Sequence, residues 1–165
     1  MNQLNNIPDE QIEQALSTIG NNIEETGSIN PKDVTQEDAQ IFYSFAHQLY
    51  QTGEYEKAEP IFRKLCISRP LEARNWMGLA ASLQEQAKYD IAVVAWSMVC
   101  FMQNDYAKAH FHAAECLVSL NNLDDAQSAL NACKEHAKND ESLLNRIEAL
   151  EESVNSRKLN LQVQD

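Results

Sequence analysis

One pattern is written three times in succession: AQIFYSFAHQLYQTGEYEKAEPIFRKLCISRP at residues 39–70, ARNWMGLAASLQEQAKYDIAVVAWSMVCFMQN at 73–104, and AKAHFHAAECLVSLNNLDDAQSALNACKEHAK at 107–138. When the three lines are aligned, small and apolar residues recur 34 residues apart. They form five columns: Ala46, Ala80 and Ala114; Leu49, Leu83 and Leu117; Tyr55, Tyr89 and Leu123; Ala58, Ala92 and Ala126; and Phe62, Trp96 and Leu130. The alanines suit places where two helices approach too closely for a larger side chain, and the larger residues fill the surrounding space.

This period predicts an all-α fold. A repeat of 34 residues with these residue types is typical of the tetratricopeptide repeat (TPR), a helix–turn–helix unit that must stack on neighbours to bury its apolar face. We therefore expect an α-solenoid of three tandem TPRs within residues 36–140. Their bounds are 39–72, 73–106 and 107–140. Helices are expected at 36–51, from the turn at 52–54 to 68, at 73–86 and at 89–103, with two more between 106 and 137. Thr35 and Asp38 have the spacing of a helix N-cap and its capping partner.

The turn inside each repeat depends on whether its residues tolerate a left-handed backbone. Gly53 does so without strain, and Asn121 tolerates that region better than most residues. The second repeat has Ala87 at this place, where a left-handed conformation is strained by roughly 1 kcal/mol. A differently shaped turn is therefore expected in the second repeat.

The segments on either side of the repeats are expected to be helical as well. Residues 1–35 are predicted to be an N-terminal helical region and linker, with an amphipathic helix from Pro8 to about Glu25. Its apolar stripe consists of Ile12, Ala15, Leu16, Ile19 and Ile23. Two roles stay open for this helix: covering the first repeat, or contacting a partner, including a second copy. Residues 141–158 are expected to form a C-terminal capping helix, and residues 159–165 to fray.

The charge balance excludes several classes of partner. The chain has a net charge of −12, whereas nucleic acids and anionic membrane surfaces require a basic face. It contains no apolar run near the roughly 20 residues of a membrane helix, and its polar, acidic N-terminus does not resemble a signal peptide. We therefore expect a protein of the cytosol that binds neither nucleic acid nor membranes directly.

Motifs for catalysis are missing from the sequence. There is no phosphate-binding loop and no H-E-x-x-H motif, and the four cysteines form no C-x-x-C pair. His112 and Cys116 share one helical face, but His110 points about 200° away from His112, and two ligands do not make a zinc site. The expectation is a protein that is not an enzyme and needs no cofactor or metal. A thiol- or metal-dependent enzyme centred on His112 and Cys116 is the alternative.

A second set of positions on the first helix of each repeat lines the concave face of a TPR stack. The predicted peptide-binding groove uses Gln40, Tyr43, His47, Tyr50, Arg74, Met77, Ala81, Lys108 and Phe111. Tyr43, Met77 and Phe111 occupy one column, which is apolar in all three repeats. Such a column can be ordinary core. Because the five columns described above already supply a core, however, a second apolar face indicates a binding partner.

Three segments carry a resemblance to a known family. They are FYSFAHQLYQTGEYEKAEPIFRKLCI at 42–67, MGLAA at 77–81 and FHAAECL at 111–117. With them, residues 36–135 resemble the class II chaperones of bacterial type III secretion systems, which hold the pore-forming translocator proteins. The resemblance implies three TPRs whose concave groove binds an extended N-terminal translocator segment with spaced prolines and a leucine. His47 departs from the bulky aromatic residue of several relatives, and Gly20-Asn21-Asn22-Ile23 departs from their usual turn.

The resemblance implies a specific function. The chain is expected to be an ATP-independent chaperone of the bacterial cytoplasm that prevents translocators from aggregating or associating prematurely before export. A homodimer through the N-terminal helix is a further expectation from relatives. The alternative function is a TPR scaffold or a transcriptional co-regulator of the secretion system, with a DNA-binding regulator as its partner. The sequence leaves the client translocators unidentified.

Overall fold

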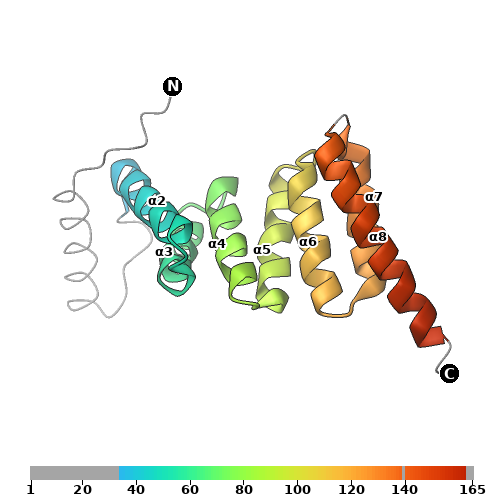
Figure 1. Ribbon diagram of the computed structural model, residues 1–165. Coiled ribbons are helices and arrows are strands. Elements are labelled where there is room, and N and C mark those ends of the chain that lie inside the picture. Colours follow the sequence, from blue (N-terminus) through green and yellow to red (C-terminus); the bar gives the residue numbers. More distant parts are fainter. Residues whose placement is uncertain (1–33, 139, 163–165) are drawn as a thin grey trace. The chain divides into compact units, whose positions relative to one another are not determined.

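The computed structural model describes residues 34–138 and 140–162, which consist of helices joined by short turns (Figure 1). The helices of this part of the chain are α2 (Gln36–Gln51), α3 (Tyr55–Ser68), α4 (Ala73–Glu85), α5 (Tyr89–Met102), α6 (Ala107–Ser119), α7 (Leu123–Ala137) and α8 (Glu141–Gln162). They fall into two compact units, one up to Ser82 and one from Leu83 onward. The predicted N-terminal helix and its linker lie outside the described residues.

The helix bounds agree closely with the sequence analysis. The all-α prediction is confirmed, and α2 and α3 have the expected limits, whereas α4 and α5 each end one residue early. Thr35 and Asp38 form the predicted capping box at the start of α2.

The expectation that the chain frays from residue 159 is wrong, because α8 continues to Gln162. Two contacts hold its last turns: Lys158 pairs with Asp124 at 2.7 Å, and Arg157 donates to the Val118 carbonyl at 3.0 Å.

The turns inside the three repeats share one geometry. Gly53, Ala87 and Asn121 have φ values of 82°, 57° and 58°, so the expectation of a differently shaped second turn is wrong. Each turn is closed by a backbone bond from an amide to the leucine carbonyl five residues earlier. The bonds are Glu54 to Leu49 at 2.8 Å, Lys88 to Leu83 at 2.9 Å, and Asn122 to Leu117 at 2.9 Å. These bonds satisfy carbonyls at the helix end, which offsets the roughly 1 kcal/mol of strain at Ala87.

The first unit has its core between α2, α3 and the larger part of α4. The buried apolar residues are Ala39, Phe42, Ala46, Ala58, Phe62, Leu65, Cys66, Leu79 and Ala80. Gly78 lies against the ring of Phe62, and a Cβ added at Gly78 would overlap that ring. Glycine therefore allows α4 to approach α3 closely. Asn75 is also buried at this contact, and its side-chain amide donates to the Leu65 carbonyl at 3.4 Å.

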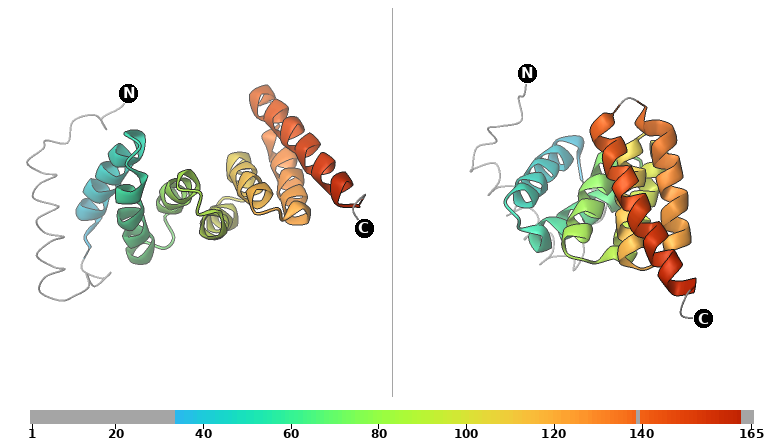
Figure 2. Two further views of the ribbon diagram at one scale, coloured as in Figure 1. Left: turned by 60° about the horizontal axis from the view of Figure 1, so that its bottom comes forward. Right: turned by 45° about the vertical axis from the view of Figure 1, so that its right-hand side comes forward.

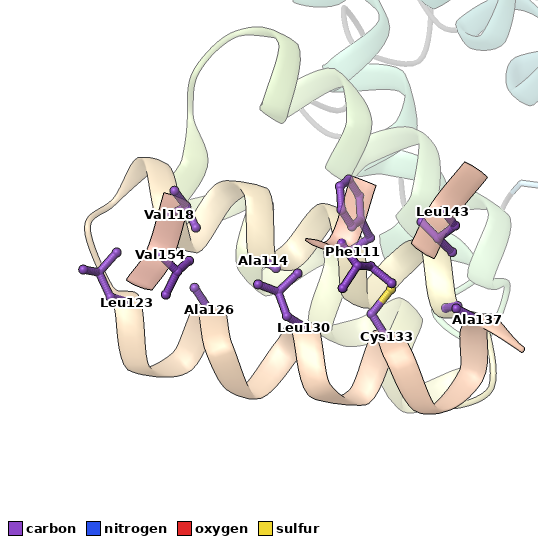
Figure 3. Packing of buried hydrophobic residues seen from close by; sticks show 12 residues of the cluster. Phe111, Ala114, Val118, Leu123, Ala126, Leu130, Cys133, Ala137, Leu143 and Val154 are labelled. Atoms are coloured by element: carbon purple, nitrogen blue, oxygen red, sulfur yellow. The ribbon is translucent and has the colours of Figure 1, made fainter. Parts of the chain in front are cut away.

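The second unit has an apolar cluster where α6, α7 and α8 meet (Figure 3). Its buried members are Ala107, Phe111, Ala114, Val118, Leu123, Ala126, Leu130, Cys133, Ala137, Leu143, Ile147 and Val154. Both views of Figure 2 show α8 running alongside α7. Leu143, Ile147 and Val154 lie on one face of α8, so this helix covers apolar surface that the third repeat would otherwise expose.

All four cysteines are free thiols. Cys66, Cys116 and Cys133 are buried, and Cys100 is half-buried. Burial raises the pKa of Cys66 and Cys116 to about 12, and that of Cys100 and Cys133 to about 11. At neutral pH these thiols stay protonated, so they act as small apolar side chains.

Candidate functional site

A partly exposed face on α2 and α4 brings together most of the predicted groove residues. We call it the first-repeat face; its members are Gln40, Tyr43, His47 and Tyr50 of the first repeat, with Arg74, Met77 and Ala81 of α4, the first helix of the second repeat, and none of them is fully buried. Phe42 and Ala46 point into the core, and the next residue along the chain in each case, Tyr43 and His47, is rotated by about 100° around α2. The rotation of α2 that turns Phe42 and Ala46 into the core therefore also determines which of its residues form this face.

Tyr43 lies at the centre of the first-repeat face. Its ring meets the buried ring of Phe62 edge-on, with centroids 5.8 Å apart and an interplanar angle of 71°. The same ring stacks with His47, with centroids 6.0 Å apart and planes 16° from parallel. Tyr50 similarly contacts Tyr55 at 5.2 Å. Because Phe62 is held in the core, Tyr43 has a fixed support, which limits the side-chain entropy that binding would remove.

Arg74 joins α4 to α2 across this face. Its guanidinium carbon lies 4.7 Å from the centroid of the Tyr43 ring, and its Nη1 donates to Gln40 Oε1 at 2.9 Å. On its other side, Arg74 is paired with Glu72 at 3.0 Å. Gln40 and Arg74 are second-position residues of adjacent repeats, so the period of the sequence could have identified this contact. These bonds give the polar edge of the face a fixed arrangement.

The state of the Tyr43 hydroxyl follows from its surroundings. Partial burial raises the pKa of Tyr43 above 10.0, and the positive charge of Arg74 opposes this shift without cancelling it. The hydroxyl is therefore protonated at neutral pH and can donate a hydrogen bond. An aromatic ring with one such donor suits a ligand that combines apolar side chains with peptide carbonyls.

The structure corrects one predicted groove residue in the second unit. Phe111 is only 3% exposed and belongs to the apolar cluster of α6, α7 and α8, so its side chain is core and not an open surface. The guanidinium of Arg146, from α8, covers its ring at 4.3 Å from the centroid. The cause is the capping helix, which packs where an open repeat would leave Phe111 accessible. Lys108, on the same helix α6, is exposed as expected.

A hydrogen-bonded network in the second unit was not predicted from the sequence. We call it the Glu115 network; its members are Gln84, Trp96, His112, Glu115 and Arg146. Glu115 accepts from Gln84 Nε2 at 3.1 Å and from Arg146 Nη2 at 3.3 Å, and its Oε2 lies 2.8 Å from His112 Nδ1. Trp96 Nε1 donates to Gln84 Oε1 at 2.8 Å, and the indole stacks on His112 with centroids 4.9 Å apart. A buried tryptophan needs an acceptor for its N–H. This requirement at Trp96 was the signal by which the sequence could have indicated the network.

The charge of Glu115 is held in place by this network. Burial opposes ionisation of the carboxyl, but the bonds from His112 and Gln84, together with the charge of Arg146, keep its pKa below 4.5. Because the pKa is lower in the folded chain than in the unfolded chain, the ionised carboxylate stabilises the fold above pH 4.5. That contribution is lost as the pH falls through the folded-state pKa.

We therefore expect Glu115→Gln to reduce the acid sensitivity of the second unit. The free energy of unfolding of the natural chain should decrease between pH 6 and pH 3 by more than that of the variant. Urea denaturation at a series of pH values, followed by circular dichroism, measures both. Glu135→Gln, which removes an exposed carboxylate on α7, is the control and should leave the pH dependence unchanged. Equal acid sensitivity in the natural chain and Glu115→Gln would contradict the role given to the network.

The residues of the alternative enzyme hypothesis have other roles in the fold. His112 is engaged by Glu115 and Trp96, and the raised pKa of Cys116 keeps its thiol protonated. Residues 34–138 and 140–162 contain no group of three or more His, Cys, Asp or Glu side chains arranged to hold a metal ion. Within the same residues, no helix combines the length and apolar character needed to cross a membrane.

Comparison with known proteins identifies the repeats and places the chain among relatives. The tetratricopeptide repeat family model matches residues 42–69 and 75–103. Low calcium response locus protein H of Yersinia pestis is 33% identical over 103 residues, which is 62% of this chain and 61% of that protein. The chain thus matches about three-fifths of the length of this curated relative.

Solved structures of translocator chaperones share the fold. The Yersinia enterocolitica type III secretion chaperone SycD, in complex with a peptide of the translocator YopD, matches with a TM-score of 0.71 and 30% identity, covering 76% of this chain and 98% of SycD. PcrH of Pseudomonas aeruginosa, in complex with the chaperone-binding region of PopD, matches with a TM-score of 0.71 and 30% identity, covering 77% and 98%. By its repeats, its sequence and its fold, the chain belongs to the family of type III secretion translocator chaperones.

Proposed function

We propose that this chain is a chaperone that binds an extended segment of a hydrophobic type III translocator, with the first-repeat face as its contact in the first unit. The observation that carries the proposal is that face itself, a supported aromatic and apolar surface left open beside a complete core. The relatives SycD and PcrH, which share the fold, are seen with translocator peptides. The same class of ligand fits the chemistry of this face.

The side chains of the face suit an extended apolar segment. Tyr43 and Tyr50 offer a large contact area for few rotatable bonds, and Met77 adapts its shape to different partners. The protonated hydroxyl of Tyr43 can donate to a peptide carbonyl, whereas Arg74 and Gln40 supply polar groups beside the apolar area. His47 is exposed and stacked on Tyr43, so it adds a polar rim to the face.

The physical benefit of such a complex is the masking of apolar surface. A translocator has membrane-inserting segments that aggregate in water unless they are covered. The net charge of −12 on the chaperone keeps the complex soluble. We place this activity in the bacterial cytoplasm, before export, and it requires no nucleotide and no catalysis. In this proposal, the N-terminal region is residues 1–35, the repeat domain is residues 36–140, and the cap is residues 141–165.

Substitutions on the first-repeat face are expected to weaken binding of a translocator peptide. Tyr43→Ala, Tyr50→Ala and Met77→Glu should each raise the dissociation constant by at least about tenfold, because each removes an anchor or places a charge in an apolar contact. Calorimetric titration with a peptide from the N-terminal part of a translocator measures the change. Far-UV circular dichroism should be unchanged, because these side chains are not part of the core.

The matched control is Tyr106→Ala, which removes a tyrosine that is 37% exposed and lies outside this face. It should bind the peptide as the natural chain does. Unchanged affinity in all three variants of the face would overturn the proposed site.

Recovery of partners from the native bacterium separates this function from the alternative one. A translocator with apolar helices among the bound proteins supports the chaperone function. A DNA-binding regulator recovered alone supports the transcriptional co-regulator instead. The two roles are compatible, so recovery of both proteins would assign both partners. A homodimer through residues 1–35 stays a proposal that this experiment does not address.

A further inference from the structure

The imidazole of His112 has one ring nitrogen engaged and the other open. Its Nδ1 lies 2.8 Å from Oε2 of Glu115, and because an ionised carboxylate only accepts hydrogen bonds, the proton between them belongs to Nδ1. In the neutral ring Nε2 is then an acceptor. Within residues 34–138 and 140–162 this Nε2 has no hydrogen-bond partner, and the His112 side chain is 31% exposed. The second unit therefore presents an open acceptor at its surface.

Three neighbours hold the His112 ring in one orientation. Trp96 stacks on it with centroids 4.9 Å apart and planes 20° from parallel, and Phe111 meets it edge-on with centroids 5.9 Å apart. Both of these rings are buried in the core of the second unit. The bond to Glu115 fixes the rotation of the imidazole between them. A group that is fixed in advance loses little conformational freedom when it binds, which favours a role for Nε2 in recognition.

Glu115 also holds a hydrogen-bond donor close to this acceptor. While its Oε2 accepts from His112, its Oε1 accepts from Nη2 of Arg146 on α8 at 3.3 Å. The Arg146 side chain is 51% exposed, and a guanidinium has five N–H donors, of which this bond uses one. One carboxylate thus positions a partly exposed acceptor from α6 and a partly exposed donor from α8.

An acceptor and a donor held close together match the backbone of an extended peptide. Each peptide unit has an N–H and a C=O, and both need a partner when a segment in extended conformation leaves water. A charged ligand group fits less well, because Glu115 repels an anion and Arg146 repels a cation. We propose that the second unit binds the backbone of the translocator segment, with His112 Nε2 accepting from a peptide N–H and Arg146 donating to a peptide carbonyl. This inference rests on the proposed function, because its ligand is the same segment.

His112→Asn tests the open nitrogen. The asparagine amide can still donate to Glu115 from near the place of Nδ1, but it has no atom at the place of Nε2. The dissociation constant of a translocator peptide should rise about three- to tenfold, which corresponds to the usual contribution of one hydrogen bond. Calorimetric titration at pH 8, where an imidazole is ordinarily neutral, measures the change. The matched control is His136→Asn, which makes the same substitution on α7 and should leave the affinity unchanged.

Arg146→Met tests the donor. Methionine keeps an apolar side chain over the Phe111 ring but has no N–H, so the dissociation constant should rise by a similar factor. Thermal melting of both variants verifies that the second unit is folded under the conditions of the titration. An unchanged affinity in Arg146→Met would remove this residue from the contact, and an unchanged affinity in His112→Asn would overturn the proposal.

Peptides with a single ester in place of one amide test the backbone bond itself. The ester removes one N–H and keeps the side chains of the segment. In a series with the ester moved along the peptide, one position should weaken binding to the natural chain about three- to tenfold and binding to His112→Asn less than about twofold, because the variant has no bond to lose there. A series in which every ester affects the two proteins equally would overturn the proposal.

The failure of this inference is distinguishable from the failure of the proposed function. If no translocator peptide binds the natural chain, both are wrong. If Tyr43→Ala weakens binding while His112→Asn and Arg146→Met do not, the chaperone function stands and the backbone contact in the second unit is wrong.

Discussion

Trp96→Ala is expected to lower the free energy of unfolding of the second unit by about 3–5 kcal/mol. The indole is only 5% exposed, and it occupies a column that all three repeats fill with a large apolar residue. Removing it leaves a cavity on the buried side of α5, ends the stacking with His112, and takes the N–H donor from Gln84. Urea denaturation followed by far-UV circular dichroism measures the change without relying on tryptophan fluorescence.

Trp96→Phe separates packing from hydrogen bonding in the same place. Phenylalanine keeps much of the buried ring but has no N–H, so Gln84 Oε1 loses its donor. The loss should be about 1–2 kcal/mol, which is the usual penalty for leaving a partly buried polar group unpaired. If Trp96→Phe were as destabilising as Trp96→Ala, the hydrogen bond and not the packing would dominate at this position. If Trp96→Ala changed stability by less than about 1 kcal/mol, the column would not be a core column.

The repeat columns explain why so much of the fold could be predicted from the sequence. A period of 34 residues requires that equivalent positions have equivalent surroundings, and the alanine columns are indeed fully buried. Their members, each 0% exposed, are Ala46, Ala58, Ala80, Ala92, Ala114 and Ala126. The same logic located the three intra-repeat turns. The expectation for the shape of the Ala87 turn was wrong because it followed the preference of alanine, and the repeated backbone bond outweighs that preference.

The candidate site was less predictable because its exposure depends on what covers it. Tyr43 and Phe111 occupy equivalent repeat positions, yet Tyr43 is partly exposed whereas Phe111 is buried. The difference comes from α8, which packs beside α6 and places Arg146 over the Phe111 ring. Repeat periodicity describes the environment within a repeat and its neighbours. It contains no information about a terminal helix that ends the periodicity.

The Glu115 network was missed for a related reason. Its members come from α4, α5, α6 and α8, and their sequence separations differ from the repeat period. Polar side chains at such positions read as ordinary solvent-exposed residues. Their pairing becomes visible only when the helices are placed together. By contrast, the Gln40–Arg74 bond joins residues one period apart, so a contact of that kind can be inferred from the sequence.

Ile147→Asp should separate α8 from the third repeat. Ile147 is 0% exposed and lies in the apolar cluster with Leu130 and Phe111. The substitution removes most of the buried side chain and places a carboxylate among apolar groups, so the second unit should lose at least about 4 kcal/mol of stability. The expected result is a lower urea midpoint, loss of helical circular dichroism from α8, and faster tryptic cleavage at Arg146 and Arg157.

Ala149→Asp is the matched control for this prediction, because it adds the same charge two residues away on the exposed side of α8. Its stability should remain within about 0.5 kcal/mol of that of the natural chain. Detachment of α8 should also uncover Phe111 and its neighbours, so Ile147→Asp should bind a dye specific for apolar surface, whereas Ala149→Asp should not. If the two variants behaved alike, α8 would be an accessory helix, and the burial of Phe111 would need another cause. A loss confined to Ile147→Asp would show that the third repeat depends on this cap to close its apolar surface.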